Sequence, residues 1–223
     1  MSRSASPAPE PDRWFALTEL HGPRVRLVPL RIEHADEYLA ALHSDGGADE
    51  VVRWLGSGPA PKDVAGAEQQ ILTALAARAR GERLAYAQLD AATGEFIGTT
   101  SFYEITPGAR AIAIGHTWLG RRWWRTGHNT DSKLLMLTHA FEQWRVHRVA
   151  LQTDVRNKRS WAAIERIGGQ LDGIMRADRP GADDTVRTSA RFSIVASEWP
   201  AVKARLTAQL GQRAGGQESG PTD

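Results

Sequence analysis

The spacing of hydrophobic and polar positions predicts strands and helices that alternate along the first half of the chain. Residues 24–30 ("RVRLVPL") alternate strictly, which predicts a strand. Helical patterns cover 31–43 and 60–80, the second beginning at Pro61 and ending near Gly81. Three strand-like segments separated by short turns come next and are typical of an antiparallel meander; they are 84–90, 95–105 and 110–120.

The second half of the chain continues this alternation. A helical pattern after residue 128 precedes an apolar strand at 147–155, and another helix begins at Asn157, a favourable N-cap, and ends at Gly168. A hairpin and a terminal helix follow, at 170–176, 186–195 and 198–210. The order predicts an α/β (α+β) fold with a mixed, mostly antiparallel sheet flanked by helices.

The two ends of the chain differ from the segment between them. Residues 1–13 and 211–223 ("GQRAGGQESGPTD") are rich in proline, glycine, serine and charge, and we expect both to be disordered tails. One domain is therefore expected over residues 14–210.

Composition narrows the class of protein. The chain has 223 residues, 41% hydrophobic and 24% charged, so it can bury a real core. It has no cysteine, which excludes disulfides and cysteine metal sites. No segment reaches the ~18 to 20 apolar residues of a membrane span, and "MSRSASPAPEPD" lacks the apolar core of a signal peptide. We expect a cytoplasmic protein without a membrane partner, either a monomer or a homodimer.

Charge is concentrated in one part of the chain. Residues 121–160 hold nine Lys/Arg and three acids, a net +6 in a chain whose formal charge is +2. This surplus indicates an anionic ligand near the segment, although a solvated basic face has the same composition.

The segment "WWRTGHNTDSK" (123–133) lies in this basic region, between a strand and a helix. The first N–H groups of a helix lack internal partners and carry partial positive charge, and Gly127 lets a ligand approach the backbone. A phosphate or diphosphate fits such a site. Neither G-x-x-x-x-G-K-[ST] nor G-x-G-x-x-G is present, so the usual ATP, GTP and NAD motifs are missing.

These residues resemble a known family. The run "GHTWLGRRWWRTGHNTDSKLLMLTHAFE", a strand, and then "TDVRNKRSWAAIERIGG" are similar to the GNAT acyl-CoA N-acyltransferases, in particular the RimJ/RimL-type branch that acetylates N-termini of ribosomal proteins. The similarity extends from about residue 22 to residue 210. The family pattern (Gln/Arg)-x-x-Gly-x-(Gly/Ala) falls on residues 124–129, where only Gly127 matches strictly.

The resemblance implies acetyl-CoA as the acyl donor. It implies that the strands at 110–119 and 146–154 are parallel and splay apart, and that the pantetheine arm lies in the gap. Backbone amides of the glycine loop would hold the diphosphate. The implied cofactor-binding residues are Trp118, Leu119, Arg125, Thr126, Gly127, His128, Asn129, Thr130 and Asn157.

Two catalytic roles follow from the same resemblance. Asn157 and Ser160 match the family's Asn-x-x-Ser, in which the serine protonates the departing thiolate. Helix capping accounts equally for Asn157, and Ser160 could simply bond its own first helical turn.

The general base is less obvious. Many relatives carry glutamate in Leu-Glu-Ile-Gly, whereas this chain has Ala113 at that position. Glu104 on the preceding strand is the expected substitute, acting through water. His116 has a suitable ordinary pKa of ~6.5, but strict strand alternation would turn it away from the face of Ala113. The histidines at 128, 139 and 147 lack paired ligand spacing, so no metal site is expected.

Two other functions remain open. "RRWWR" (121–125) could stack on single-stranded nucleic acid, although tryptophans in such runs more often pack against the core, so no nucleic-acid partner is expected. The missing strand glutamate also allows a relative that binds acyl-CoA as a sensor without catalysis. The acceptor is an amine that the sequence does not identify, a protein N-terminus or a small molecule. A succinyl donor would need a basic residue near the acyl end.

Overall fold

One mixed sheet organises the chain in the computed structural model, which describes residues 14–56, 58–181 and 185–215. Within these residues the strand order is β1-β2-β3-β4-β5-β6-β8-β7. All neighbours are antiparallel except β5 and β6. The strands are β1 Leu20–His21, β2 Val25–Pro29, β3 Arg83–Asp90, β4 Phe96–Thr106, β5 Ala111–Leu119, β6 Arg148–Asp154, β7 Gln170–Pro180 and β8 Val186–Val195.

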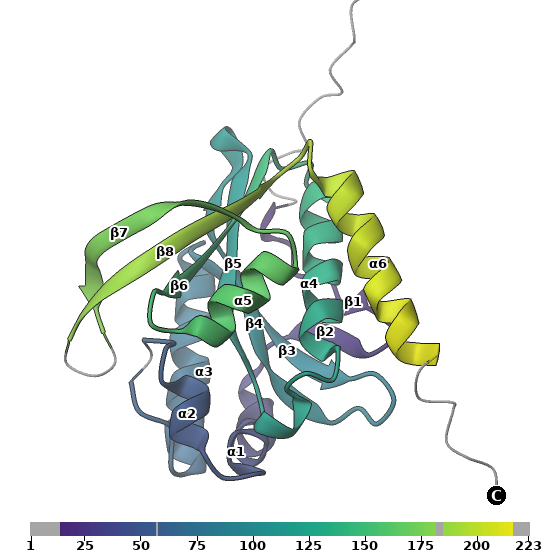
Figure 1. The fold of residues 1–223 in the computed structure, drawn as a ribbon. Coiled ribbons are helices and arrows are strands. Elements are labelled where there is room, and N and C mark those ends of the chain that lie inside the picture. The colour runs from purple at the N-terminus through teal and green to yellow at the C-terminus, as the bar shows by residue number, and fades with distance from the viewer. Residues whose placement is uncertain (1–13, 57, 182–184, 216–223) are drawn as a thin grey trace, which may run out of the picture.

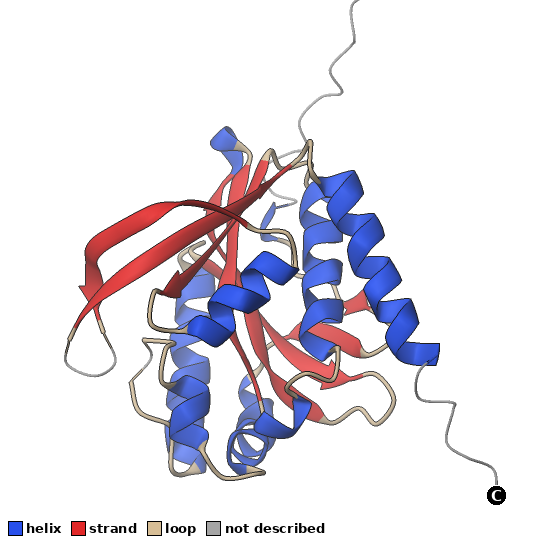
Figure 2. Ribbon diagram, viewed as in Figure 1, coloured by secondary structure: helices blue, strands red, loops and turns tan. Residues whose placement is uncertain are grey.

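Helices cover both faces of this sheet (Figures 1 and 2). α1 and α3 pack on one face, while α4 and α6 run side by side on the other. The helices are α1 Ala35–His43, α2 Ala48–Val52, α3 Val64–Ala79, α4 His128–Thr138, α5 Lys158–Arg166 and α6 Trp199–Gly215, with short helical turns η2 Ile32–His34, η3 Pro107–Ala109, η4 Arg121–Trp123 and η5 His139–Gln143. The predicted α+β architecture is confirmed.

Strand periodicity divides the interior into two cores. On β3, Leu84 and Tyr86 join the core beneath α4 and α6, whereas Ala85 and Ala87 join the core beneath α1 and α3. Successive side chains of a strand point to opposite faces, so a strand covered on both faces is buried throughout.

Several element boundaries differ from the sequence expectation, among them those of α3 and α6. The predicted helix at 60–80 begins only after Asp63, whose carboxylate accepts the Gly66 N–H at 2.8 Å and so caps α3. α6 continues to Gly215, five residues past the expected boundary at 210. Gly211 lacks the positive φ that ends a helix, so the chain remains helical through it.

The expected tails, 1–13 and 216–223, lie outside the described residues. Over the part of the chain that the structure covers, every helix is too short or too polar to cross a membrane.

Candidate active site

The N-terminus of α4 presents a row of unpaired backbone amides. Gly127 is the N-cap with φ +98°, a conformation that favours glycine, and no side chain caps the helix. The Trp124 N–H donates to Arg121 and the Asp131 N–H to Gly127, each at 3.0 Å. Between them, the five N–H groups of residues 126–130 have no acceptor among the described residues. Five consecutive free donors at the positive end of a helix form a cradle for an anion, here called the amide cradle.

The side chains of Thr126 and His128 stabilise the amide cradle through hydrogen bonds within the protein. The Thr126 hydroxyl lies 2.6 Å from the Trp123 carbonyl and 2.7 Å from His128 Nδ1. His128 Nε2 lies 2.9 Å from Asp90 Oδ2 on β3, and both residues are buried. Burial opposes ionisation of Asp90, but hydrogen bonds from His128 and Thr93 outweigh it and lower the pKa of the carboxyl. Thr126 and His128, both predicted to bind cofactor, therefore have only their backbone amides available for it.

The surplus of basic residues in 121–160 is partly neutralised within the protein. Five of the nine form ion pairs with acids, two of them with Glu50 of α2; the five are Arg121, Arg122, Arg148, Arg156 and Arg159. The charge excess alone is thus weaker support for an anionic ligand than the amide cradle is.

β5 and β6 separate after three paired residues. Their parallel pairing covers Ala111–Arg148, Ile112–Val149 and Ala113–Ala150 and then ends, which matches the predicted splayed pair. Beyond it, the carbonyls of Trp118 and Leu119 accept hydrogen bonds from Gln88 Nε2 at 3.2 Å and Trp124 Nε1 at 2.8 Å.

A β-bulge in β5 places His116 on the face of the sheet that α1 and α3 cover. Thr99 pairs with Trp118 and Ser101 pairs with Gly115, so the two residues His116 and Thr117 lie opposite the single residue Thr100. The backbone of His116 has φ +48°. Thr117 turns toward α4, where its hydroxyl lies 2.7 Å from the buried Lys133 ammonium. The expectation that His116 faces away from the side of Ala113 is wrong, because the extra residue interrupts the alternation on which it rested.

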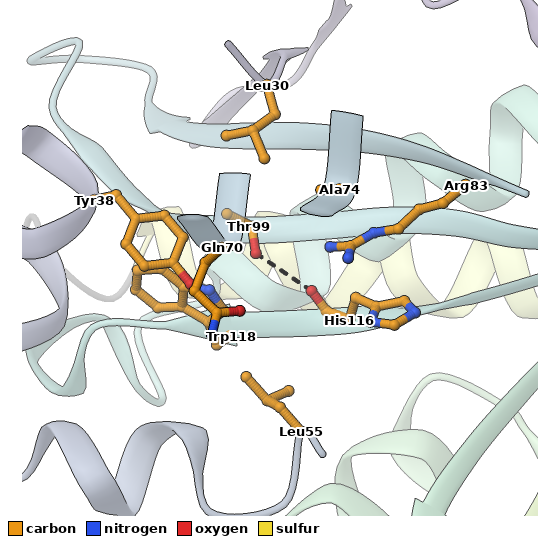
Figure 3. Close-up of a pocket in the computed structure, with 9 residues that line it drawn as sticks. All are labelled: Leu30, Tyr38, Leu55, Gln70, Ala74, Arg83, Thr99, His116 and Trp118. Atoms are coloured by element: carbon orange, nitrogen blue, oxygen red, sulfur yellow. Dashed lines mark hydrogen bonds between the residues drawn. The ribbon is translucent and has the colours of Figure 1, made fainter. Parts of the chain in front are cut away.

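His116 borders a small cavity between α1, α3 and the sheet (Figure 3). The cavity holds about 40 Å³ and is lined by Leu30, Tyr38, Leu55, Gln70, Ala74, Arg83, Thr99, His116 and Trp118. Desolvation, with smaller contributions from the Arg83 and Arg179 cations, lowers the pKa of His116 to about 3. The imidazole is therefore neutral at physiological pH.

Glu104, the predicted base, lies apart from this cavity. It follows Tyr103, whose ring packs edge-on against His116 at 5.2 Å between centroids. Its carboxylate pairs with Arg191 of β8 at 2.5 Å, and it lines a second cavity of about 200 Å³ together with Ala111, Ala150 and Arg148. The structure thus places His116, and not Glu104, at the cavity between α1, α3 and the sheet.

Asn157 caps α5 as its position predicts, with Oδ1 accepting the Ser160 N–H at 3.0 Å. The Ser160 hydroxyl is half-buried and has no hydrogen-bond partner among the described residues, so it is available to a ligand. The alternative that this hydroxyl bonds its own helical turn finds no support in the geometry.

Tryptophan and arginine side chains tie α2 and its following loop to α5 and the cradle. The Arg159 guanidinium stacks 3.6 Å from the centre of the Trp124 ring and pairs with Glu50 at 3.7 Å. Trp123 packs edge-on against His128 at 4.6 Å. Both tryptophans of "RRWWR" are thus committed to contacts within the protein.

Sequence reasoning missed Arg83, Tyr38 and the support that Lys133 gives to the bulge. Arg83 is the first residue of β3, which is separated from β5 by β4. Its position near His116 depends on the strand order, which the local sequence does not predict. Among the described residues no group of three or more potential metal ligands occurs.

Comparison with known proteins agrees with this architecture. The family model "Acetyltransferase (GNAT) domain" matches residues 24–170. A GCN5-related N-acetyltransferase from Brucella melitensis is 29% identical, with a TM-score of 0.82 over 92% of this chain and 88% of that one. A candidate acetyltransferase from T. thermophilus is 32% identical, with a TM-score of 0.75 over 86% of this chain and 96% of that one.

Mycobacterium smegmatis RimJ, solved in complex with CoA-disulfide, shares the fold at 22% identity, with a TM-score of 0.71 over 86% of this chain and 93% of that one. The family model covers about two thirds of the sequence, and the amide cradle, the separating parallel strands and the bulge all lie within it. The chain belongs to the GNAT acetyltransferase family.

Proposed function

We propose that the chain is an acyl-CoA-dependent N-acyltransferase that moves an acetyl group from acetyl-CoA directly to a primary amine. The observation that carries this proposal is the amide cradle of residues 126–130 beside two separating parallel strands. The CoA-disulfide complex of M. smegmatis RimJ supports the same class of donor for this fold.

The roles of the residues follow from their positions. The amides of residues 126–130, with Arg125 at the entrance, would hold the diphosphate. The pantetheine arm would lie along the free edge of β5 at Trp118 and Leu119 and meet the Asn157 side-chain amide, whose oxygen is already used as a cap. The Ser160 hydroxyl would donate its proton to the departing thiolate and regain one from solvent.

Direct attack by the amine needs no covalent intermediate on the protein. As the carbon–nitrogen bond forms and the carbon–sulfur bond breaks, the amine loses one proton and the thiolate gains one. We propose that the neutral His116 accepts a hydrogen bond from the attacking amine and orients it. Its lowered pKa makes it a weak base, so the proton would pass through water to Glu104 or to solvent.

A glycine pair tests the cradle. Gly127→Ala places a side chain at φ +98°, which strains the loop, and should weaken acetyl-CoA binding at least tenfold by calorimetry. Gly108→Ala is the control, because a Cβ there meets nothing within 4 Å and its φ is not positive. No measurable binding of acetyl-CoA to the unaltered protein would refute the proposal.

Catalysis is tested by thiol release from acetyl-CoA with panels of peptides and small amines. The chain has no cysteine, so it contributes no background thiol. His116→Gln should slow turnover more than Glu104→Gln if the imidazole meets the amine, and the reverse order would favour Glu104.

A second candidate is an acyl-CoA sensor that does not transfer the group. Ala113 at the position of the family's glutamate and the engagement of Glu104 by Arg191 favour it. Single-turnover measurements separate the two, since a sensor binds acetyl-CoA but returns it intact in the presence of every amine.

A further inference from the structure

Arg83 is a cation without an anionic partner among the described residues. It is half-buried at the start of β3, and its Nε donates to the Ser101 hydroxyl at 2.8 Å. No carboxylate in the described part of the chain pairs with it, whereas Arg80, three residues earlier, pairs with Glu82 at 2.7 Å. Desolvation lowers the pKa of Arg83 to about 10. Withdrawing an unpaired charge from water is unfavourable, so such a group is typical of a binding site.

The surroundings restrict what Arg83 can bind. The cavity that it lines has mixed walls, apolar at Leu30, Leu55 and Trp118, and no Asp or Glu among its described lining residues. Figure 3 shows the guanidinium reaching over the sheet beside His116. A volume of about 40 Å³ exceeds the roughly 10–15 Å³ that one water molecule needs and suits a group of the size of a carboxylate.

We propose that Arg83 binds a carboxylate carried by one of the two substrates, either the far end of a dicarboxylic acyl group or the carboxylate of the acceptor amine. Nε is taken by Ser101, which leaves the two terminal nitrogens for a bidentate pair of the kind that guanidinium and carboxylate form. The diphosphate of the donor has its own place at the amide cradle, so it does not account for Arg83. This inference rests on the proposed function and specifies its substrate class.

Binding measurements distinguish the two sources. In the donor arm, calorimetry compares succinyl-CoA with acetyl-CoA on the full chain. In the acceptor arm, the protein is saturated with CoA, and the rise in its melting temperature is compared for glycine against glycinamide and for glutamate against glutamic acid diamide. Each pair in the acceptor arm differs only in its carboxylates.

We expect either at least tenfold tighter binding of succinyl-CoA in the donor arm or a larger rise in melting temperature with the carboxylate form in the acceptor arm, and the arm that responds identifies the source. Arg83→Met should abolish the preference, Arg83→Lys should keep part of it, and the control Arg80→Met should keep all of it. If Arg83→Met does not fold, Arg83→Lys and Arg83→Gln give the same comparison.

Two other outcomes have distinct meanings. Tight acetyl-CoA binding without a carboxylate preference in either arm overturns the role of Arg83 and leaves the proposed function intact. A preference that survives in Arg83→Met also overturns it. Failure to bind any CoA overturns the proposed function itself.

Discussion

Lys133 provides a sharp test of the electrostatics behind the bulge. Its ammonium is buried and lies 2.7 Å from the Thr117 hydroxyl and 3.0 Å from that of Thr100. No carboxylate pairs with it among the described residues, and desolvation lowers its pKa from 10.5 to about 7. We predict that Lys133→Met stabilises the protein at pH 7 and loses this advantage at higher pH.

The sign follows from proton counting. Between pH 7 and 10.5 the unfolded chain holds a proton on Lys133 that the folded chain has released, so raising the pH favours the folded state. At nearly 1.4 kcal/mol per pH unit, less near the folded pKa, the wild type should gain about 3 kcal/mol of unfolding free energy from Lys133 between pH 7 and 9.5. This gain is the larger part of a desolvation cost of about 4 kcal/mol that is present at pH 7.

Methionine has a similar length and no charge to desolvate. The hydroxyls of Thr100 and Thr117 remain bonded to each other at 2.8 Å, so the substitution loses only the two bonds from the ammonium, about 1 kcal/mol each. Lys133→Met should therefore be more stable than wild type by about 2 kcal/mol at pH 7, and equal or slightly less stable at pH 9.5.

Urea unfolding followed by tryptophan fluorescence at both pH values measures this difference. Lys62→Met is the control, because Lys62 is exposed and should show no such dependence. An equal loss of stability in Lys133→Met at pH 7 and 9.5 would show that the ammonium is compensated in the folded protein, and the reasoning would fail.

Substitutions at three further positions test the site. Ser160→Ala should slow thiol release at least tenfold and leave acetyl-CoA affinity by calorimetry unchanged; equal losses would reduce Ser160 to a structural residue. Asn157→Asp should keep the cap and the melting temperature, whereas Asn157→Ala costs about 1 kcal/mol; unchanged acetyl-CoA affinity in the aspartate variant would argue against a contact from the side-chain amide. The lowered folded pKa of Asp90 gives stability that is present above its unfolded pKa and lost as pH falls through the folded value. Asp90→Asn should therefore be destabilising at pH 6, and its difference from wild type in urea unfolding should shrink toward pH 3; a constant difference would contradict the His128–Asp90 assignment.

Local sequence patterns predicted the features that depend on neighbouring residues. Helix starts at Gly127 and Asn157 were predictable because a cap is set by residues within one helical turn. The separation of β5 and β6 came instead from resemblance to a family, since no local pattern encodes how far two parallel strands stay paired. Neither local patterns nor the family resemblance predicted the cavity at Arg83, because its lining residues come from elements that are distant in the sequence.

The bulge shows why the face of a side chain cannot be read from alternation alone. Alternation assigns each side chain to a face on the assumption of an unbroken strand, and one additional residue reverses the face of everything that follows. Residues distant in sequence fix the bulge. Lys133 and Thr100 hold Thr117 on the face that α4 covers, so His116, at φ +48°, lies on the opposite face, beneath α1 and α3. The cost of burying Lys133 and the position of the imidazole are thus linked. A more stable Lys133→Met variant that also loses turnover would indicate that stability is given up here to position His116.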